Sequence, residues 1–115
     1  MKRILWLSQH RSLARQIAEL RRIFGEVEVL QDVNPFSSAE DIIQRIRGGG
    51  YDETVVVAPL SVIAKLCELG LRPLWAEMEQ VQRRSEAEVV ARGRFYRFQK
   101  FRRITAVRLE FEELG

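Results

Sequence analysis

A pattern that recurs three times between residues 4 and 81 limits the folds open to this chain more than any other feature. Each repeat contains an extended apolar run, a turn with a serine, a helical segment and a glycine. The third run, residues 54–58, is β-branched and uncharged, which is typical of a strand buried on both faces. Strands that alternate with helices favour a parallel sheet with right-handed crossovers and helices on its faces.

Serines and glycines mark the expected ends of the helices. Each helix is predicted to begin at a serine cap, at Ser12, Ser37 and Ser61. Each is predicted to end at a glycine, at Gly25, residues 48–50 and Gly70. Glu40 follows Ser37 at the spacing of a capping box, in which each side chain bonds the other residue's backbone. Residues 74–81 are predicted to be a fourth strand.

The last third of the chain departs from this pattern. The structure of residues 88–92 is left open, whereas residues 95–101 and 104–111 are predicted to form two antiparallel strands. A chain of 115 residues fits one domain, with βα repeats in residues 1–81 and a connection and hairpin in residues 82–115. The expected fold class is α/β and Rossmann-like, with a mainly parallel sheet flanked by helices and a C-terminal antiparallel hairpin.

Several classes of site are excluded by what the chain lacks. One cysteine, Cys67, and one histidine, His10, allow neither an internal disulfide nor a zinc site of nitrogen and sulfur ligands. The glycine-rich motifs of dinucleotide and nucleoside triphosphate sites are missing, as is a G-x-S-x-G nucleophile turn. We therefore expect no cofactor and no metal. The apolar runs are too short to cross a bilayer, so we expect no membrane partner and a cytoplasmic location.

The loops that follow the predicted parallel strands are the expected binding site. In an open parallel sheet the ligand lies beyond the carboxyl ends of the strands, where helix N-termini favour negative charge. The residues expected to bind ligand at this edge are Ser8, Gln9, His10, Arg11, Asn34, Ser37, Ser61 and Lys65.

His10 is the candidate catalytic residue at this edge, because histidine is the side chain whose ordinary pKa lies near neutrality. A surface histidine without a role remains an open alternative. Ser37 and Ser61 have an alternative too, since helix capping by itself accounts for serine at these positions. Arg11 and Lys65 are either partners for a phosphate or solvated charges.

Residues 92–103 form a second candidate site, with six basic and four aromatic residues in twelve. This mixture suits a strand that stacks bases and binds phosphates of DNA or RNA. It equally suits an edge strand at a dimer interface, with the aromatic residues inward and the arginines at the rim. We favour the interface over direct nucleic-acid binding.

A family resemblance involves the end of the first strand and the start of the first helix. The residues that carry it are Leu7, Ser8, His10, Leu13 and Gln16. Through them, about the first 80 residues resemble the small CRISPR-associated ring nucleases and the wider group of CARF-like, Rossmann-like domains that sense cyclic oligoadenylates. Gln9 separates the serine and the histidine, which are adjacent in the family pattern.

The resemblance implies a homodimer that binds a two-fold symmetric cyclic oligonucleotide and cleaves it without a metal. The attack would come from a ribose 2′-hydroxyl on the adjacent phosphate. His10 and Ser8 would be catalytic, Ser61 would hold phosphate or ribose oxygens, and Arg11 and Lys65 would balance charge. The alternatives are binding without cleavage, and a non-enzymatic accessory protein that binds nucleic acid or dimerises through its C-terminal hairpin.

Overall fold

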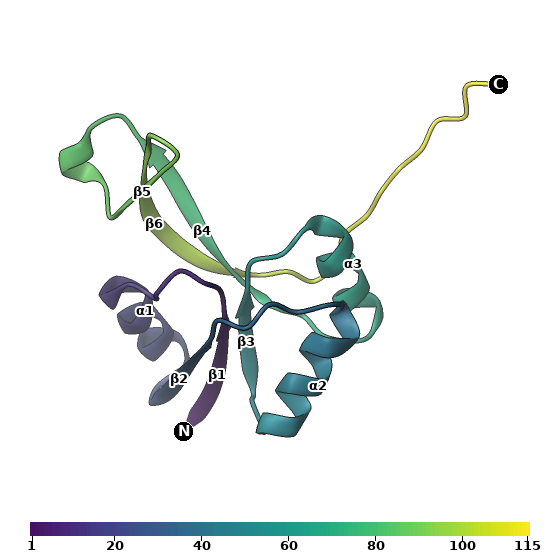
Figure 1. Ribbon diagram of the computed structural model, residues 1–115, viewed down its shortest axis with the longest axis horizontal. Coiled ribbons are helices and arrows are strands. Elements are labelled where there is room, and N and C mark those ends of the chain that lie inside the picture. The colour runs from purple at the N-terminus through teal and green to yellow at the C-terminus, as the bar shows by residue number, and fades with distance from the viewer.

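The computed structural model describes residues 1–115 as one six-stranded mixed sheet with three α-helices (Figure 1). The strands are β1 (Lys2–Leu7), β2 (Val27–Asp32), β3 (Glu53–Val56), β4 (Leu74–Val81), β5 (Val89–Ala91) and β6 (Arg94–Arg103). The helices are α1 (Ala14–Phe24), α2 (Ala39–Gly49), α3 (Leu60–Glu68) and the short 3-10 helix η1 (Arg84–Glu86). No helix has the length and apolar composition needed to span a membrane.

The strand order is β2-β1-β3-β4-β6-β5, in which β1 to β4 are parallel and β6 is antiparallel to both of its neighbours. The chain goes from β1 to β2 in one direction and then crosses back to β3 on the other side of β1. The α/β class and the mainly parallel sheet with an antiparallel C-terminal part are therefore confirmed. The order does not establish a Rossmann relationship, because the Rossmann sheet runs 3-2-1-4.

Strand β1 is buried on both faces, as expected of an inner strand. Ile4 and Trp6 face α1 and pack with Leu20, whereas Leu5 and Leu7 face α2 and α3. The alternation follows from the pleat, which sends successive side chains to opposite faces. Both helical layers are thus anchored on the same central strand, and the loop that follows β1 starts from a rigid base.

The helix ends match the glycine predictions better than the serine predictions. Gly50 follows α2 in the left-handed conformation, with a φ of 65°. The predicted capping box at Ser37 is wrong by one residue, because Ser38 is the cap and its hydroxyl accepts the N–H of Asp41 at 3.1 Å. This register directs Ala39 and Ile42 into the core.

The other two predicted serine caps are also wrong. Helix α1 starts after Leu13, whose N–H donates to the side chain of Gln16 at 2.7 Å, so Ser12 does not cap it. Helix α3 starts directly after Pro59, whose φ of −59° already suits a helical start, and Ser61 lies inside the first turn.

The predicted hairpin of residues 95–101 and 104–111 is wrong. Strand β6 pairs along its length with β4, and its hairpin partner is β5, for which no strand is predicted from the sequence. Arg92 and Gly93 have φ values of 52° and 73° and form the tight turn between β5 and β6, a geometry that matches the twist of paired strands. Residues 104–115 form no strand.

The pairing of β4 with β6 is interrupted by a bulge. The register shifts between Glu77 and Met78, which pair with Lys100 and Phe98, so Gln99 is the extra residue. A bulge bends a strand and changes which face the following side chains occupy. The β4-β6-β5 ribbon extends beyond the parallel part of the sheet (Figure 1).

Candidate functional site

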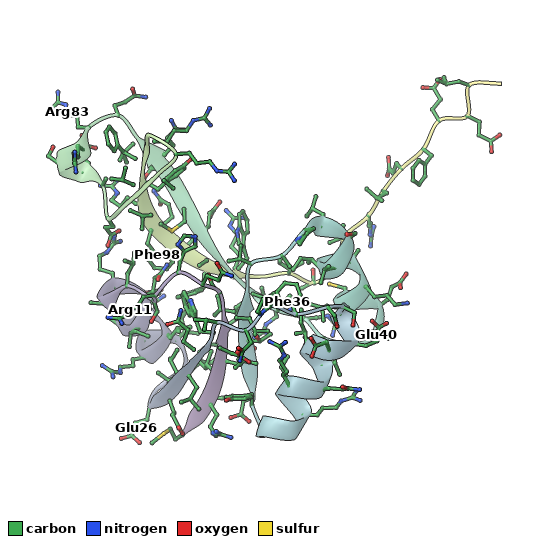
Figure 2. All side chains as sticks on the ribbon, viewed as in Figure 1. Arg11, Glu26, Phe36, Glu40, Arg83 and Phe98 are labelled. Atoms are coloured by element: carbon green, nitrogen blue, oxygen red, sulfur yellow. The ribbon has the colours of Figure 1, made fainter.

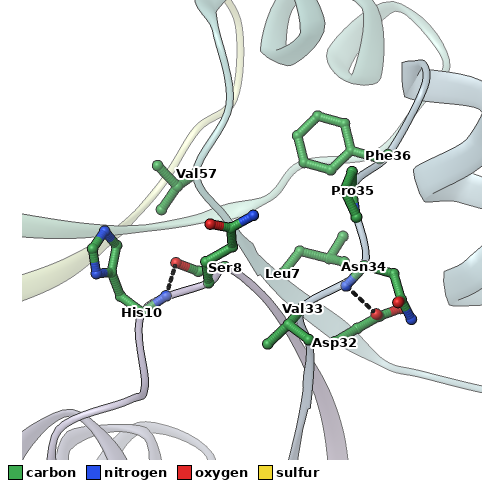
Figure 3. A pocket seen from close by; sticks show the side chains of 10 residues that line it. Leu7, Ser8, His10, Asp32, Val33, Asn34, Pro35, Phe36 and Val57 are labelled. Carbon is green, nitrogen blue, oxygen red and sulfur yellow. Dashed lines mark hydrogen bonds between the residues drawn. The ribbon is translucent and has the colours of Figure 1, made fainter.

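An open cavity of about 350 Å³ lies at the carboxyl ends of β1, β2 and β3 (Figure 3). Its polar lining comes from Ser8, Gln9, His10, Asp32 and Asn34. Its apolar lining comes from Leu7, Val33, Pro35, Phe36 and Val57. The cavity lies where the strand order reverses between β1 and β3, which is the usual ligand position in open α/β sheets.

The loop after β1 is held by two side chains from the sheet. The indole N–H of Trp6 donates to the carbonyl oxygen of His10 at 3.1 Å. The amide nitrogen of Gln31, on β2, donates to the carbonyl oxygens of Ser8 at 2.9 Å and His10 at 3.1 Å. The backbone N–H of His10 also donates to the Ser8 hydroxyl oxygen at 3.1 Å (Figure 3). The loop is therefore fixed, whereas the His10 imidazole is exposed at the cavity.

The loop after β2 is organised by Arg45 from α2. Its guanidinium donates to the Asn34 carbonyl oxygen at 2.9 Å and to the Pro35 carbonyl oxygen at 2.6 Å. It also contacts the Asp32 carboxylate at 3.3 Å, while the other oxygen of that carboxylate accepts the N–H of Asn34 at 2.9 Å. The Asp32 charge at the cavity wall is thus balanced from outside the cavity.

The starts of α1 and α2 are partly closed by the protein's own side chains. The pKa of the Asp41 carboxyl lies below its ordinary value, first because the carboxyl accepts the backbone N–H of Ser37 and then because of Arg45. The N–H of Leu13 is likewise bonded to the Gln16 side chain. The N–H groups of Leu13 and Ser37, which precede the first turns of α1 and α2, are therefore occupied by the protein's own side chains and are not free for an anionic ligand.

The structure brings together half of the residues predicted to form the site. Those that line the cavity are Ser8, Gln9, His10 and Asn34. Ser37, Ser61 and Arg11 are exposed but are not part of its lining. Lys65 lies outside as well, and its ammonium group is 3.3 Å from the Glu68 carboxylate. Lys65 therefore does not supply a positive charge for a phosphate at this cavity.

Three contributors to the site were missed by the sequence analysis. Asp32 and Asn34 form a turn through the Asp32 side chain, for which the Asp-x-Asn spacing was a signal. Arg45 follows Asp41 by four residues, the spacing of a helical ion pair, but its reach to the β2–α2 loop depends on tertiary packing. Phe36 gives the cavity its aromatic side chain; it lies in the loop expected at this edge but was not among the predicted ligand-binding residues.

Two of the four aromatic residues of the segment 92–103, Phe98 and Phe101, serve the protein's own core. Phe98 is 2% exposed and lies against α1 (Figure 2), where Arg15 stacks 5.7 Å from the ring centre. Phe101 meets Trp6 edge to face at 6.2 Å. Strand β6 is not a sheet edge, because β4 and β5 pair with it on both sides. The predicted edge strand is therefore wrong, and these two rings are unavailable for base stacking.

Basic residues of β6 are also engaged within the chain. Three of them form ion pairs, namely Arg97 with Glu79 at 3.1 Å, Arg102 with Glu77 at 2.9 Å, and Arg103 with Glu53 at 2.8 Å. Phosphate contacts would have to compete with these carboxylates. Half of the six basic residues of the segment thus have a structural role.

Comparisons with protein-family models, with curated proteins and with solved structures find no match for this chain. The structure contains no group of three or more His, Cys, Asp or Glu side chains that could hold a metal ion. The groups available at this cavity, called here the β1–β3 cavity, are therefore a hydroxyl, an imidazole, two carboxamides, the Asp32 carboxylate and an aromatic face.

Proposed function

We propose that the chain binds a cyclic oligoadenylate, with one nucleotide unit seated in the β1–β3 cavity. The observation that carries the proposal is the position of this cavity at the strand-order reversal, together with its mixed lining. Its volume of about 350 Å³ falls within the range of small-molecule sites, roughly 300 to 1,000 Å³. A Rossmann-like relationship to the ring nucleases belongs to the same proposal.

The lining offers distinct partners for the base and the ribose. The Phe36 ring and the Val57 side chain suit a base face, and the carboxamides of Gln9 and Asn34 suit the polar edge of adenine. The Ser8 hydroxyl can donate to a ribose or phosphate oxygen while it accepts the N–H of His10. Trp6, Gln31 and Arg45 tie the backbone of the two loops, so the loops that carry these side chains are ordered before the ligand arrives.

Cleavage is the second part of the proposal and involves His10. The neutral imidazole takes the proton of a ribose 2′-hydroxyl, the 2′ oxygen forms a bond to the adjacent phosphorus, and the bond from phosphorus to the 5′ oxygen breaks. The leaving 5′ oxygen takes a proton from water, and the hydroxide that remains takes the proton from the His10 imidazolium. The product is a linear oligonucleotide that ends in a 2′,3′-cyclic phosphate. A two-fold symmetric ring would require two such cavities, one from each chain of a homodimer.

The alternative function, a non-enzymatic nucleic-acid-binding or dimerising role for residues 92–103, stays a prediction with weaker support. Phe98 and Phe101 are packed inside the domain, and three arginines of the segment are paired with carboxylates. Binding of DNA or RNA would therefore rest on the remaining exposed cations, such as Arg94 and Lys100.

The test is calorimetric titration with cyclic tetra-adenylate in EDTA, with linear tetra-adenylate as the competitor and chromatography of the products. We expect Asn34→Ala to weaken binding and His10→Ala to abolish cleavage while the ring is still bound. Ser61→Ala is the matched control, because Ser61 was a candidate but lies outside the cavity, and it should leave both unchanged. Absence of binding to the cyclic ligand would overturn the proposal.

A further inference from the structure

The C-terminal tail, residues 105–115, carries apolar side chains that nothing in the domain covers. The tail is anchored at Ile104, whose N–H donates to the Pro73 carbonyl oxygen at 2.9 Å, and Val107 still packs against the core. Beyond this point Leu109, Phe111 and Leu114 are 72%, 87% and 92% exposed. Leu109 and Phe111 are two positions apart and share one face of the extended segment, the arrangement by which an extended peptide inserts side chains into a partner's pockets.

The course of the tail leads away from its own domain. It leaves beside α3 and extends outward (Figure 1). Between Thr105 and Leu114 it has no glycine, proline, asparagine, aspartate or serine, the residues that would reverse its direction. At roughly 3.3 Å per residue an extended segment of this length reaches about 35 Å. The tail is therefore suited to a surface on another molecule.

A matching surface lies between the C-terminal ends of α2 and α3. A hollow of about 90 Å³ is lined there by Ile43, Ile46, Leu69 and Leu71, with Arg47 among the lining residues. It is well below the roughly 300 Å³ of a typical small-molecule site. Leu69 is 40% exposed at this hollow. Its size and lining suit an apolar side chain of a peptide.

Charge favours this hollow, called here the α2–α3 groove, as the acceptor of the tail. The tail carries Glu110, Glu112 and Glu113 between its apolar residues, and the groove carries Arg47. Strands β2 and β5 are the two sheet edges and could each accept an extended segment. The charged residues of β2 are both acidic and offer the glutamates of the tail no cation, and β5 spans only Val89–Ala91, which is too short to pair with a segment of this length.

We propose that the tail of one copy docks in the α2–α3 groove of a second copy, and that the second tail docks in return. Such an exchange uses the same two surfaces on both chains and closes with two-fold symmetry, so it stops at a dimer. Phe111 and Leu109 supply the apolar anchors, and the glutamates lie beside Arg47. This contact requires no nucleotide. A failure to dimerise and a failure to bind the cyclic oligoadenylate are therefore separate outcomes.

The oligomeric state of the full chain, measured by sedimentation without ligand, is the first test. We expect a dimer, and we expect Phe111→Asp combined with Leu109→Asp to raise its dissociation constant on the order of tenfold or more. Arg108→Asp is the matched control, because it introduces the same residue on the polar face of the tail. Both anchors are exposed within one chain, so circular dichroism should be unchanged. A monomeric wild type, or a dimer indifferent to the double change, overturns the proposal.

Cross-linking then identifies the acceptor. In a Cys67→Ala background, which removes the single native thiol, one chain carries Phe111→Cys and a second, tagged chain carries Leu69→Cys. Oxidation of the mixture should give a covalent heterodimer joined between these two positions, as read by mass spectrometry. A dimer that never joins them refutes the groove as acceptor. A single chain with both changes that closes on itself at the mass of one chain refutes docking on a second copy.

Discussion

The parallel part of the sheet and the β4-β6-β5 ribbon are stabilised in different ways. The parallel part is covered by helices on both faces, and its central strand is almost wholly buried. The ribbon packs one face on α1 and carries ion pairs between β4 and β6, such as Arg102 with Glu77, on the other. Polar residues therefore have different roles in the two parts. At the parallel strand ends they line a cavity, whereas along the ribbon they bind one another.

The largest expected effect on stability comes from truncating a buried side chain in the parallel part of the sheet. Ile42 is fully buried between α2 and the sheet, so Ile42→Ala should lower the free energy of unfolding by about 2 to 5 kcal/mol. Urea denaturation followed by circular dichroism measures it. Val57→Ala is the control, because Val57 is 65% exposed at the cavity rim, and it should cost less than about 0.5 kcal/mol.

The next effect concerns the loop that Arg45 organises. Arg45→Ala should lower the free energy of unfolding by roughly 1 to 3 kcal/mol, because the Asn34 and Pro35 carbonyl oxygens and the Asp32 carboxylate lose their partner. It should also weaken ligand binding more than it weakens folding. Arg22→Ala removes an exposed arginine of α1 and should leave both nearly unchanged. Equal effects of the two changes would contradict a special role for Arg45.

A smaller effect is the dependence of stability on pH at the start of α2. Because the folded pKa of Asp41 lies below its ordinary value, its contribution is present above the ordinary pKa and is lost as pH falls through the folded pKa. The gap in unfolding free energy between wild type and Asp41→Asn should therefore be constant well above the ordinary pKa of 3.8 and should close as the pH falls below that value. If the difference in unfolding free energy persists at low pH, the effect of Asp41→Asn comes from the changed hydrogen-bonding shape of the side chain and not from its charge.

The smallest effect is expected on the ribbon. Glu79 and Arg97 are both more than two-fifths exposed, so Glu79→Gln should change the unfolding free energy by at most about 1 kcal/mol, and by less in high salt. Glu86→Gln, at a position without an ion pair, is the control for lost charge. A cost for Glu79→Gln similar to that of Ile42→Ala would erase the contrast between the two parts of the sheet.

Patterns within one segment could be predicted from the sequence, and contacts between segments could not. The spacing of apolar residues indicated all three α-helices and the four parallel strands, because burial imposes a period on each element. The positions of Ser8, His10 and Asn34 at one edge followed from parallel topology. The role of Arg45 was not visible, because it depends on how α2 lies against the β2–α2 loop.

The turn of the C-terminal hairpin was misplaced for a local reason. Arg92 adopts a positive φ, which is uncommon for a residue with a side chain, so the Arg92-Gly93 turn was not recognised. The segment after Phe101 alternates like a strand, yet no turn residues separate it from β6. The alternating apolar residues of this segment are exposed and belong to no strand, so their pattern led to the wrong prediction of a paired strand.

The bulge at Gln99 changes which face of β6 the side chains on either side of it occupy. Phe98 and Phe101 are three positions apart, so on a regular strand they would point to opposite sides, yet their rings lie 5.0 Å apart, tilted together on the α1 side. A strand that ran through Gln99 without the bulge would instead turn one of the two rings to the opposite side of the ribbon. Gln99, which has no partner in the ladder, thus places both rings on the apolar side of the ribbon.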